Sequence, residues 1–342
     1  MQLKKAFTKY LLICAVILLI ANIVIDIINN SGKKEIDASR ELTTNQIDSV
    51  FLSVLKQYGI EDEWISTKKT KIAYEDSIKK QFTIKLPADL SIPLIIKDVN
   101  SIIQNDITGF VSEEKKIFGT TEIRIYTNEI LKLKATLIPD AAVVRDQNEL
   151  CFIISDVYDL SAGSFAEFLS IPHELCGIMI PGASYIVQAD SLKKYSKEYV
   201  VMLNDENTET KFRLEKDDQK ALIKNSVYNI VAGFKDVVLF CIDEQSKLFN
   251  STIYNFVRDD FLRRSIKLVH KNEFLQITSD TDEELISKFR YHCDDKSGNR
   301  QKRFLITFNE FKKIQSELDI FRKKGSRIIS LSSTGLTEKF KK

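Results

Sequence analysis

The order of hydrophobic and polar positions divides the chain into an apolar N-terminal run and two longer regions that differ in period. From Tyr10 to Ile28 the sequence reads YLLICAVILLIANIVIDII, close to the length of about 20 residues with which a helix crosses a bilayer core. Lysines precede this run, whereas four acidic and three basic residues from Asp26 to Glu41 leave the other flank at −1. The positive-inside rule therefore predicts a cytoplasmic N-terminus and periplasmic or otherwise extracytoplasmic residues beyond Asn29.

The apolar run is expected to remain as a single-pass anchor in the cytoplasmic (inner) membrane. A cleaved signal peptide is the alternative, but no convincing small-x-small cleavage site ends the run. Residues 1–29 are thus interpreted as the cytoplasmic N-terminus and anchor. The polar, aperiodic residues 30–42 are interpreted as a tether.

Residues 43–140 are expected to form a small α+β module. Helical spacing of apolar residues alternates there with period-two stretches. The expected helices are Thr43 to Tyr58 and Ser91 to Gln104, and the expected strands are Phe82 to Leu86, Glu122 to Tyr126 and Leu131 to Leu137. The module carries no chemical motif, so spacing or protein contact is its expected role.

Residues 149–333 show short apolar strands alternating with helical stretches, which predicts a mostly parallel α/β domain. The expected strands are Leu150 to Ile154, Leu175 to Ile180, Tyr199 to Leu203, Val237 to Cys241, Ile266 to Val269, Phe304 to Ile306 and Arg327 to Leu331. The expected helices are Gly163 to Leu169, Gln188 to Tyr195, Asp217 to Val231, Leu248 to Arg264, Asp282 to Tyr291 and Glu310 to Lys324. A nearly closed barrel and an open doubly wound sheet share this pattern. Residues 334–342 form a short basic tail.

Composition narrows the classes of partner. With 50 basic and 48 acidic residues the formal charge is only +2, too small for a general field that would hold nucleic acid. The cysteines lack the short spacing of zinc sites, and buried free thiols are expected. They are Cys14, Cys151, Cys176, Cys241 and Cys293.

The stretch CFIISDVYDLSAGSFAEFLSIPHELCGIMIPGASY, Cys151 to Tyr185, resembles the divergent polysaccharide deacetylase family. Ile171-Pro172 and the turn Pro181-Gly182-Ala183-Ser184-Tyr185 match the family pattern, and the end of the domain from Lys324 to Leu331 is weakly similar. The resemblance covers about Leu150 to Ser333. It implies a distorted (β/α) barrel of the NodB type, preceded here by the small α+β module and one N-terminal transmembrane helix.

The same resemblance implies a metal site, but this chain lacks several of the residues with which the family forms it. In the family one Asp and histidines hold a divalent metal that activates water, while a second Asp acts as the base. Asp156 matches the metal-binding Asp, whereas Ser155 stands at the base position, where a hydroxyl accepts no proton near neutral pH. Tyr185 is a candidate substrate contact.

None of the family's histidines falls at its expected position. The segments in which the family carries these histidines contain Asn204, Cys241 and Phe308 instead, and the whole chain has only 3 histidines. These are His173, His270 and His292, and none has another histidine at ligand spacing. Capping or surface roles are therefore expected for them.

Carboxylates could supply a different cation site. Asp156, Asp205 with Glu206, and Asp243 with Glu244 each follow an expected strand, at the end where barrel folds gather functional loops. Oxygen ligands of this kind suit Ca²⁺ or Mg²⁺. Solvated or helix-capping carboxylates are the alternative.

The sequence thus predicts a membrane-anchored envelope protein with a catalytically degenerate deacetylase-like domain that binds glycan or an envelope protein. No cofactor is expected on this interpretation, and no nucleic acid. One alternative is a metal-dependent de-N-acetylase with a rearranged site holding zinc, or Ca²⁺ or Mg²⁺ through carboxylates. The other is a pure protein scaffold. Because the base Asp and the histidines are replaced, the sequence leaves open whether the protein is an enzyme.

Overall fold

The computed structural model describes residues 42–72, 77–104, 108–117, 119–145, 148–204, 207–295 and 300–336. The chain divides into two compact units, Met1–Lys56 with Glu61–Val144 and Gln57–Ile60 with Arg145–Lys342. The predicted anchor, Tyr10 to Ile28, lies outside the described residues. Among those that are described, no helix has the length and apolar character needed to cross a bilayer.

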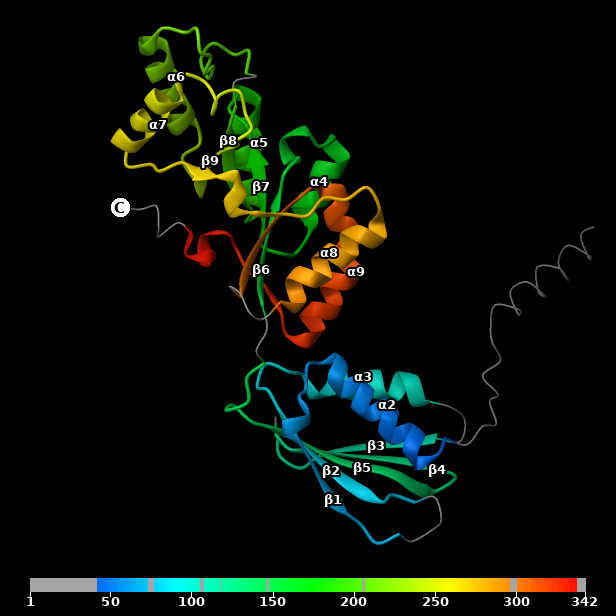
Figure 1. Ribbon diagram of the computed structural model, residues 1–342. Helices are drawn as coiled ribbons and strands as arrows, with labels where there is room; N and C mark the ends of the chain where they lie inside the picture. Colours follow the sequence, from blue (N-terminus) through cyan, green and yellow to red (C-terminus); the bar gives the residue numbers. More distant parts are fainter. Residues whose placement is uncertain are drawn as a thin grey trace, which may run out of the picture. The chain divides into compact units, whose positions relative to one another are not determined.

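The N-terminal unit is a five-stranded sheet with two helices (Figure 1). Its elements are α2 (Thr44–Gln57), β1 (Ile65–Lys69), β2 (Lys80–Leu86), α3 (Ile92–Ile103), β3 (Thr108–Glu114), β4 (Thr121–Thr127) and β5 (Ile130–Pro139). The strand order is β1-β2-β5-β4-β3, with β2 and β5 parallel and the other neighbours antiparallel. The strands β1 and β3 were not predicted, because their residues, ISTKK and TGFVSEE, show little hydrophobic alternation.

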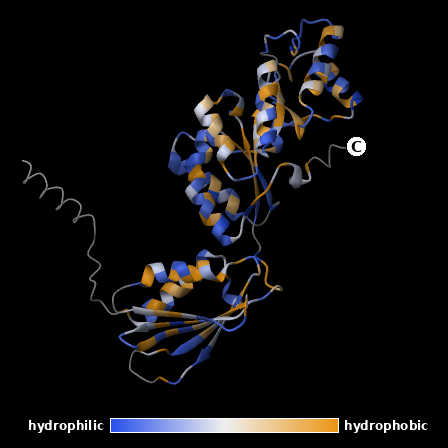
Figure 2. Ribbon diagram, turned by 180° about the vertical axis from the view of Figure 1, so that it is seen from behind, coloured by the Kyte–Doolittle hydropathy of each residue, from blue (hydrophilic) through white to orange (hydrophobic). Residues whose placement is uncertain are grey.

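Burial explains why this unit folds. The strands β2 and β4 alternate buried and less buried residues, so one face of the sheet is apolar. On that face the ring centroids of Phe51 from α2 and Phe82 from β2 lie 5.7 Å apart. Figure 2 shows hydrophobic and hydrophilic residues alternating along these elements.

The C-terminal unit contains an eight-stranded sheet in which every described neighbour pair is parallel. Its strands are β6 (Glu149–Ile154), β7 (Leu175–Met179), β8 (Glu198–Leu203), β9 (Leu239–Ile242), β10 (Val269–His270), β11 (Leu275–Gln276), β12 (Gln301–Ile306) and β13 (Arg327–Ile328). Its helices are α4 (Ala162–Ser170), α5 (Ala183–Lys194), α6 (Lys220–Gly233), α7 (Tyr254–Arg263), α8 (Asp282–Asp294) and α9 (Phe308–Lys324). The predicted helix from Leu248 to Arg264 therefore begins later, at Tyr254.

The strand order shows that the sheet is curled. It runs β10-β9-β8-β7-β6-β12-β11, with β13 beside β6. From β6 to β10 each new strand is added on the same side of the previous one. The chain then passes to the other edge, and β11 and β12 lead back to β6 in the same direction around the sheet. The two edges, β10 and β11, are joined only by Lys271–Phe274. A link of that length reaches about 18 Å, whereas seven strands laid flat would separate their edges by about 29 Å. The edges must approach each other, as in a partly closed barrel.

Two cores separate the outside of this curl from its inside. The outer core joins alternate strand residues such as Phe152 to residues from every helix from α4 to α9. The inner core joins the other alternate residues, such as Ile153, to loop residues, and contains no described residue of those helices. An open doubly wound sheet has helices on both faces. The structure is therefore a singly wound, curled parallel sheet.

The end of the domain differs from the prediction. Arg327 to Leu331 was expected to be a strand, but only Arg327 and Ile328 pair, with Glu149 and Leu150 of β6. The chain then turns inward, and Leu331 joins the inner core together with Leu336. The inner core also contains three of the buried free thiols, Cys151, Cys176 and Cys241. Burial raises the pKa of the Cys176 thiol well above its ordinary value, as expected for an inert thiol.

Candidate functional site

The carboxyl edge of the curled sheet is the candidate site. In a parallel sheet all strands end at the same edge, so the loops that follow them gather there. The described loop residues at this edge include Ser155 and Asp156 after β6, Pro181 to Tyr185 after β7, Asn204 after β8, Asp243 and Glu244 after β9, and Lys271 after β10. Asp205 and Glu206 of the predicted cation site lie outside the described residues.

Asp156 is bonded to a helix terminus. Its Oδ1 accepts a hydrogen bond of 2.8 Å from the backbone N–H of Phe308, the first residue of α9. The side chains of Thr307 and Glu310 form a capping box at the same terminus. A carboxylate at a helix N-terminus satisfies a free N–H and opposes the positive end of the helix dipole. This is the capping role that the sequence left as the alternative to metal binding.

Replacing Asp156 by alanine is therefore expected to lower the free energy of unfolding by about 1 kcal/mol. The loss should be the same in EDTA and with added Zn²⁺, Ca²⁺ or Mg²⁺, as measured by thermal melts. Asp159→Ala is the matched control, because Asp159 is exposed and makes no side-chain hydrogen bond with a described residue. A metal-dependent rise in the melting temperature of the wild type that disappears in Asp156→Ala would instead make Asp156 a ligand.

The acidic pair after β9 is bonded to the residues at the end of β10. Asp243 Oδ2 lies 2.6 Å from Lys271 Nζ, and Glu244 Oε1 lies 3.1 Å from His270 Nδ1. Burial alone would raise the pKa of Asp243, but the hydrogen bonds from Lys271 and from the Gln245 backbone N–H together hold that pKa below its usual value. Lys271 thus already neutralises one of the predicted cation ligands.

The histidines do not complete the family's metal site. His173 precedes β7, at the opposite edge of the sheet, and His292 lies on α8. Burial lowers the pKa of both imidazoles and so favours their neutral form. His270 alone reaches the carboxyl edge, where it is held by Glu244. Within the described residues no three His, Cys, Asp or Glu side chains form a metal-binding group, so the described donors do not fit the zinc site that the resemblance implies.

The turn after β7 is built by polar side chains from the next loop. Gly182 is the N-cap of α5, and the backbone N–H of Ala183 donates to both carboxylate oxygens of Glu209 at 3.2 Å. The side-chain amide of Asn207 donates to the carbonyl oxygen of Pro181. These bonds fix the first turn of α5, where Tyr185 lies. The positions of Glu209 and Asn207 in the sequence do not indicate that these residues bond to the turn.

Tyr185 pairs with a second tyrosine. The centroids of the Tyr185 and Tyr158 rings lie 6.1 Å apart with the ring planes at 90°, and both side chains are only partly buried. Tyr158 lies in the short helix Val157–Asp159 that follows β6, so the pair joins the ends of β6 and β7. Tyr185 was predicted as a substrate contact, whereas Tyr158 was not predicted as a site residue, although it stands two positions after Asp156.

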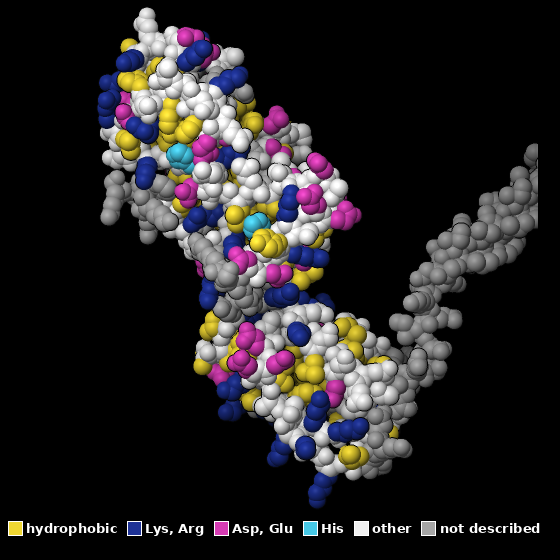
Figure 3. Space-filling view, in the orientation of Figure 1, with side chains coloured by type: hydrophobic (Ala, Val, Ile, Leu, Met, Phe, Trp, Pro, Cys, Tyr) yellow, Lys and Arg dark blue, Asp and Glu magenta, His cyan; other side chains and the backbone are white. Residues whose placement is uncertain are grey.

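Charge on the visible surface is mixed. On the face shown in Figure 3, basic and acidic side chains are interspersed and do not gather into one large patch of a single sign.

Comparisons with known proteins give no family assignment. No family model matches the chain, and no curated protein matches it. Among solved structures, the chain is similar to the uncharacterized protein ATU2773 from Agrobacterium tumefaciens C58, with 11% identity, a TM-score of 0.37 and coverage of 55% of this chain and 89% of that one. It is also similar to BA3943, a CE4 family pseudoenzyme from Bacillus anthracis, with 8% identity, a TM-score of 0.38 and coverage of 65% and 87%.

A third similar structure is a variant of the peptidoglycan deacetylase PdaC from Bacillus subtilis, with 11% identity, a TM-score of 0.34 and coverage of 58% of this chain and 94% of that one.

Proposed function

We propose that the C-terminal unit is a divergent polysaccharide deacetylase-like domain that has lost metal-dependent hydrolysis and binds glycan of the cell envelope. In this proposal the N-terminal run anchors the protein in the cytoplasmic membrane and the two units lie outside the cytoplasm. The motifs Ile171-Pro172 and Pro181 to Tyr185 support the family, as does the single winding of the curled sheet.

The observation that best supports the proposed loss of catalysis is the hydrogen bond between Asp156 and the N-terminus of α9. Hydrolysis of an acetamide in this family needs a cation to polarise the carbonyl and a base to take a proton from water. The carboxylate at the metal position instead caps α9, and Ser155 replaces the base. Of the three histidines only His270 lies at the carboxyl ends of the strands, after β10 and not beside β6, and it is bonded to Glu244. The scaffold is kept while the groups that would do the chemistry are replaced or already bonded.

Glycan binding is supported by the side chains at the same edge. Sugar rings present C–H faces that pack on aromatic rings, and their hydroxyl groups donate hydrogen bonds to carboxylates. Tyr158 and Tyr185 supply paired rings, and Asp243 and Glu244, which follow β9 two strands away from β7, supply carboxylates at the same edge of the sheet. Aromatic rings together with carboxylates suit a polyhydroxylated ligand better than a small apolar one.

Two assays on the purified full-length chain test the proposal. With acetylated chitooligosaccharide and Zn²⁺, we expect no acetate above the buffer control. With insoluble chitin or peptidoglycan, we expect the protein to co-sediment with the glycan. Zinc-dependent acetate release that Asp156→Ala abolishes would contradict the loss of catalysis, and absence of co-sedimentation with both polymers would contradict glycan binding.

A further inference from the structure

The loop after β8 holds the turn after β7, its neighbour in the sheet. The side-chain amide of Asn207 donates to the carbonyl oxygen of Pro181, and its side-chain oxygen accepts the backbone N–H of Glu209 at 2.8 Å. Both carboxylate oxygens of Glu209 then lie 3.2 Å from the backbone nitrogen of Ala183. Glu209 is thereby fixed at the carboxyl edge of the sheet.

The same turn brings Glu209 next to Tyr185, above the buried Gly182. A Cβ atom at Gly182 would lie 2.7 Å from Cδ2 of Tyr185 and 3.2 Å from Oε1 of Glu209. The backbone of Gly182 is extended, with φ 163°. The two neighbouring side chains, and not the backbone angle, therefore exclude a side chain at this position. A ring and a carboxylate thus flank the same point of the turn.

Glu209 keeps capacity to accept further hydrogen bonds. Its side chain is exposed, and it forms no ion pair with a described residue. An ionised carboxylate has about four acceptor positions, and the shared N–H of Ala183 leaves most of them open. By contrast, the Asp243 carboxylate at the same edge is already paired with Lys271. The hydroxyl group of Tyr185 also forms no hydrogen bond with a described residue.

We propose that Glu209 is a ligand-binding residue of the glycan site and that a sugar packing on the Tyr185 ring donates hydroxyl hydrogen bonds to it. This inference rests on the proposed function and adds to it a binding residue and a class of ligand. A sugar presents C–H groups on its face and hydroxyl groups at its rim, so a ring beside an acceptor matches it. Because Glu209 is anionic, the site favours a neutral glycan over an acidic one.

Glu209→Gln separates ligand binding from the holding of the turn. The glutamine oxygen can still accept the N–H of Ala183, so the melting temperature should fall only slightly. Affinity of the full-length chain for insoluble chitin should fall about fivefold, because a hydrogen bond to an ionised acceptor is stronger than one to a neutral acceptor. An unchanged affinity in a co-sedimentation titration would overturn the proposal.

Gly182→Ala tests the geometry without removing a binding group. The new methyl group must displace Tyr185, Glu209 or both, since it would overlap the ring. Binding to chitin should weaken, and adding the change to Tyr185→Ala should have a smaller effect than adding it to the wild type. Circular dichroism checks that the variant is folded. A folded Gly182→Ala protein that binds chitin like the wild type would contradict the proposed placement.

Soluble oligosaccharides test the class of ligand. Chitooligosaccharide should displace the protein from insoluble chitin, whereas an oligogalacturonate of equal length, which carries a carboxylate on each sugar, should not. Glu209→Gln should reduce this difference, because it removes the negative charge. Equal competition by the two oligosaccharides in the wild type would overturn the assignment of a neutral ligand.

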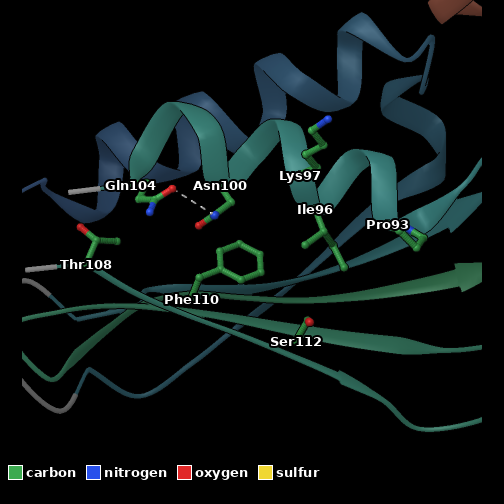
Figure 4. Close-up of a pocket in the computed structure, with 8 residues that line it drawn as sticks. All are labelled: Pro93, Ile96, Lys97, Asn100, Gln104, Thr108, Phe110 and Ser112. Carbon is green, nitrogen blue, oxygen red and sulfur yellow. Dashed lines mark hydrogen bonds between the residues drawn. The ribbon is translucent and has the colours of Figure 1, made fainter. Parts of the chain in front are cut away.

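The N-terminal unit supplies the control. A hollow of about 560 Å³ lies there between α3 and β3, and Figure 4 shows the ring of Phe110 below the side chains of Asn100 and Gln104. Phe110→Ala removes a half-buried ring and should leave chitin binding unchanged. If Tyr185→Ala has no effect, the proposed function and this inference fail together. If Tyr185→Ala weakens binding but Glu209→Gln does not, this inference alone fails.

Discussion

Phe152→Ala is expected to lower the free energy of unfolding of the C-terminal unit by about 3–5 kcal/mol. Phe152 is fully buried in the middle of β6. Its ring centroid lies 5.5 Å from that of Phe304 on β12, 5.2 Å from that of Phe311 on α9 and 6.2 Å from that of Phe289 on α8. One side chain therefore holds two strands and two helices together, and its removal leaves a cavity that these rigid neighbours cannot fill.

Urea denaturation followed by circular dichroism measures this loss. The single tryptophan, Trp64, lies in the N-terminal unit, so its fluorescence does not report directly on the C-terminal one. Phe152→Leu is the control, because it keeps most of the apolar volume and should cost less than about 1.5 kcal/mol. Equal stability of Phe152→Ala and the wild type would mean that these rings do not form the centre of the core.

Tyr185→Ala is expected to weaken binding to peptidoglycan or chitin about tenfold, which corresponds to about 1.4 kcal/mol. The change removes the ring that contacts Tyr158 and therefore half of the aromatic surface between β6 and β7. Aromatic rings contribute large contact area at small cost in side-chain entropy. A co-sedimentation titration of the full-length chain measures the change in affinity.

The same helix supplies the control for this prediction. Tyr195 is the C-cap residue at the other end of α5 and is 55% exposed, so Tyr195→Ala removes an exposed tyrosine ring away from the proposed site. Its affinity for glycan should match that of the wild type. Equal losses in both variants, or no loss in Tyr185→Ala, would place glycan binding elsewhere.

The longer elements of the fold could be predicted from the sequence because their patterns are local. The apolar run beginning at Leu150 and the helical spacing up to Lys324 correspond to β6 and α9. The strands β10 and β11 have two residues each, too few for alternation to define them: the strand predicted from Ile266 to Val269 shares only Val269 with β10, and β11 was not predicted. The choice between a barrel and a doubly wound sheet also depended on the pairing of β12 with β6, which no local pattern contains.

The residues of the site could be identified from the sequence, but the residues to which they bond could not. Asp156 was identified, but its partner Phe308 is 152 positions away, and nothing in either segment indicates the bond. The contact between Glu244 and His270 was missed for the same reason, at a separation of 26 positions. Residue identity therefore indicated what each side chain could bind, whereas the fold determined which of them already had a partner.

The place of β6 in the sheet has a consequence for folding. This strand begins the C-terminal unit, yet it lies between β7 and β12, and its residues Glu149 and Leu150 also pair with β13. During synthesis one of its edges must wait for about 150 further residues, which the ribosome adds at about 5–20 per second. Contacts so distant in sequence slow folding and leave apolar strand edges exposed to other chains. We therefore expect the nascent C-terminal unit to depend on chaperones more than the N-terminal one, whose strands pair with nearer partners.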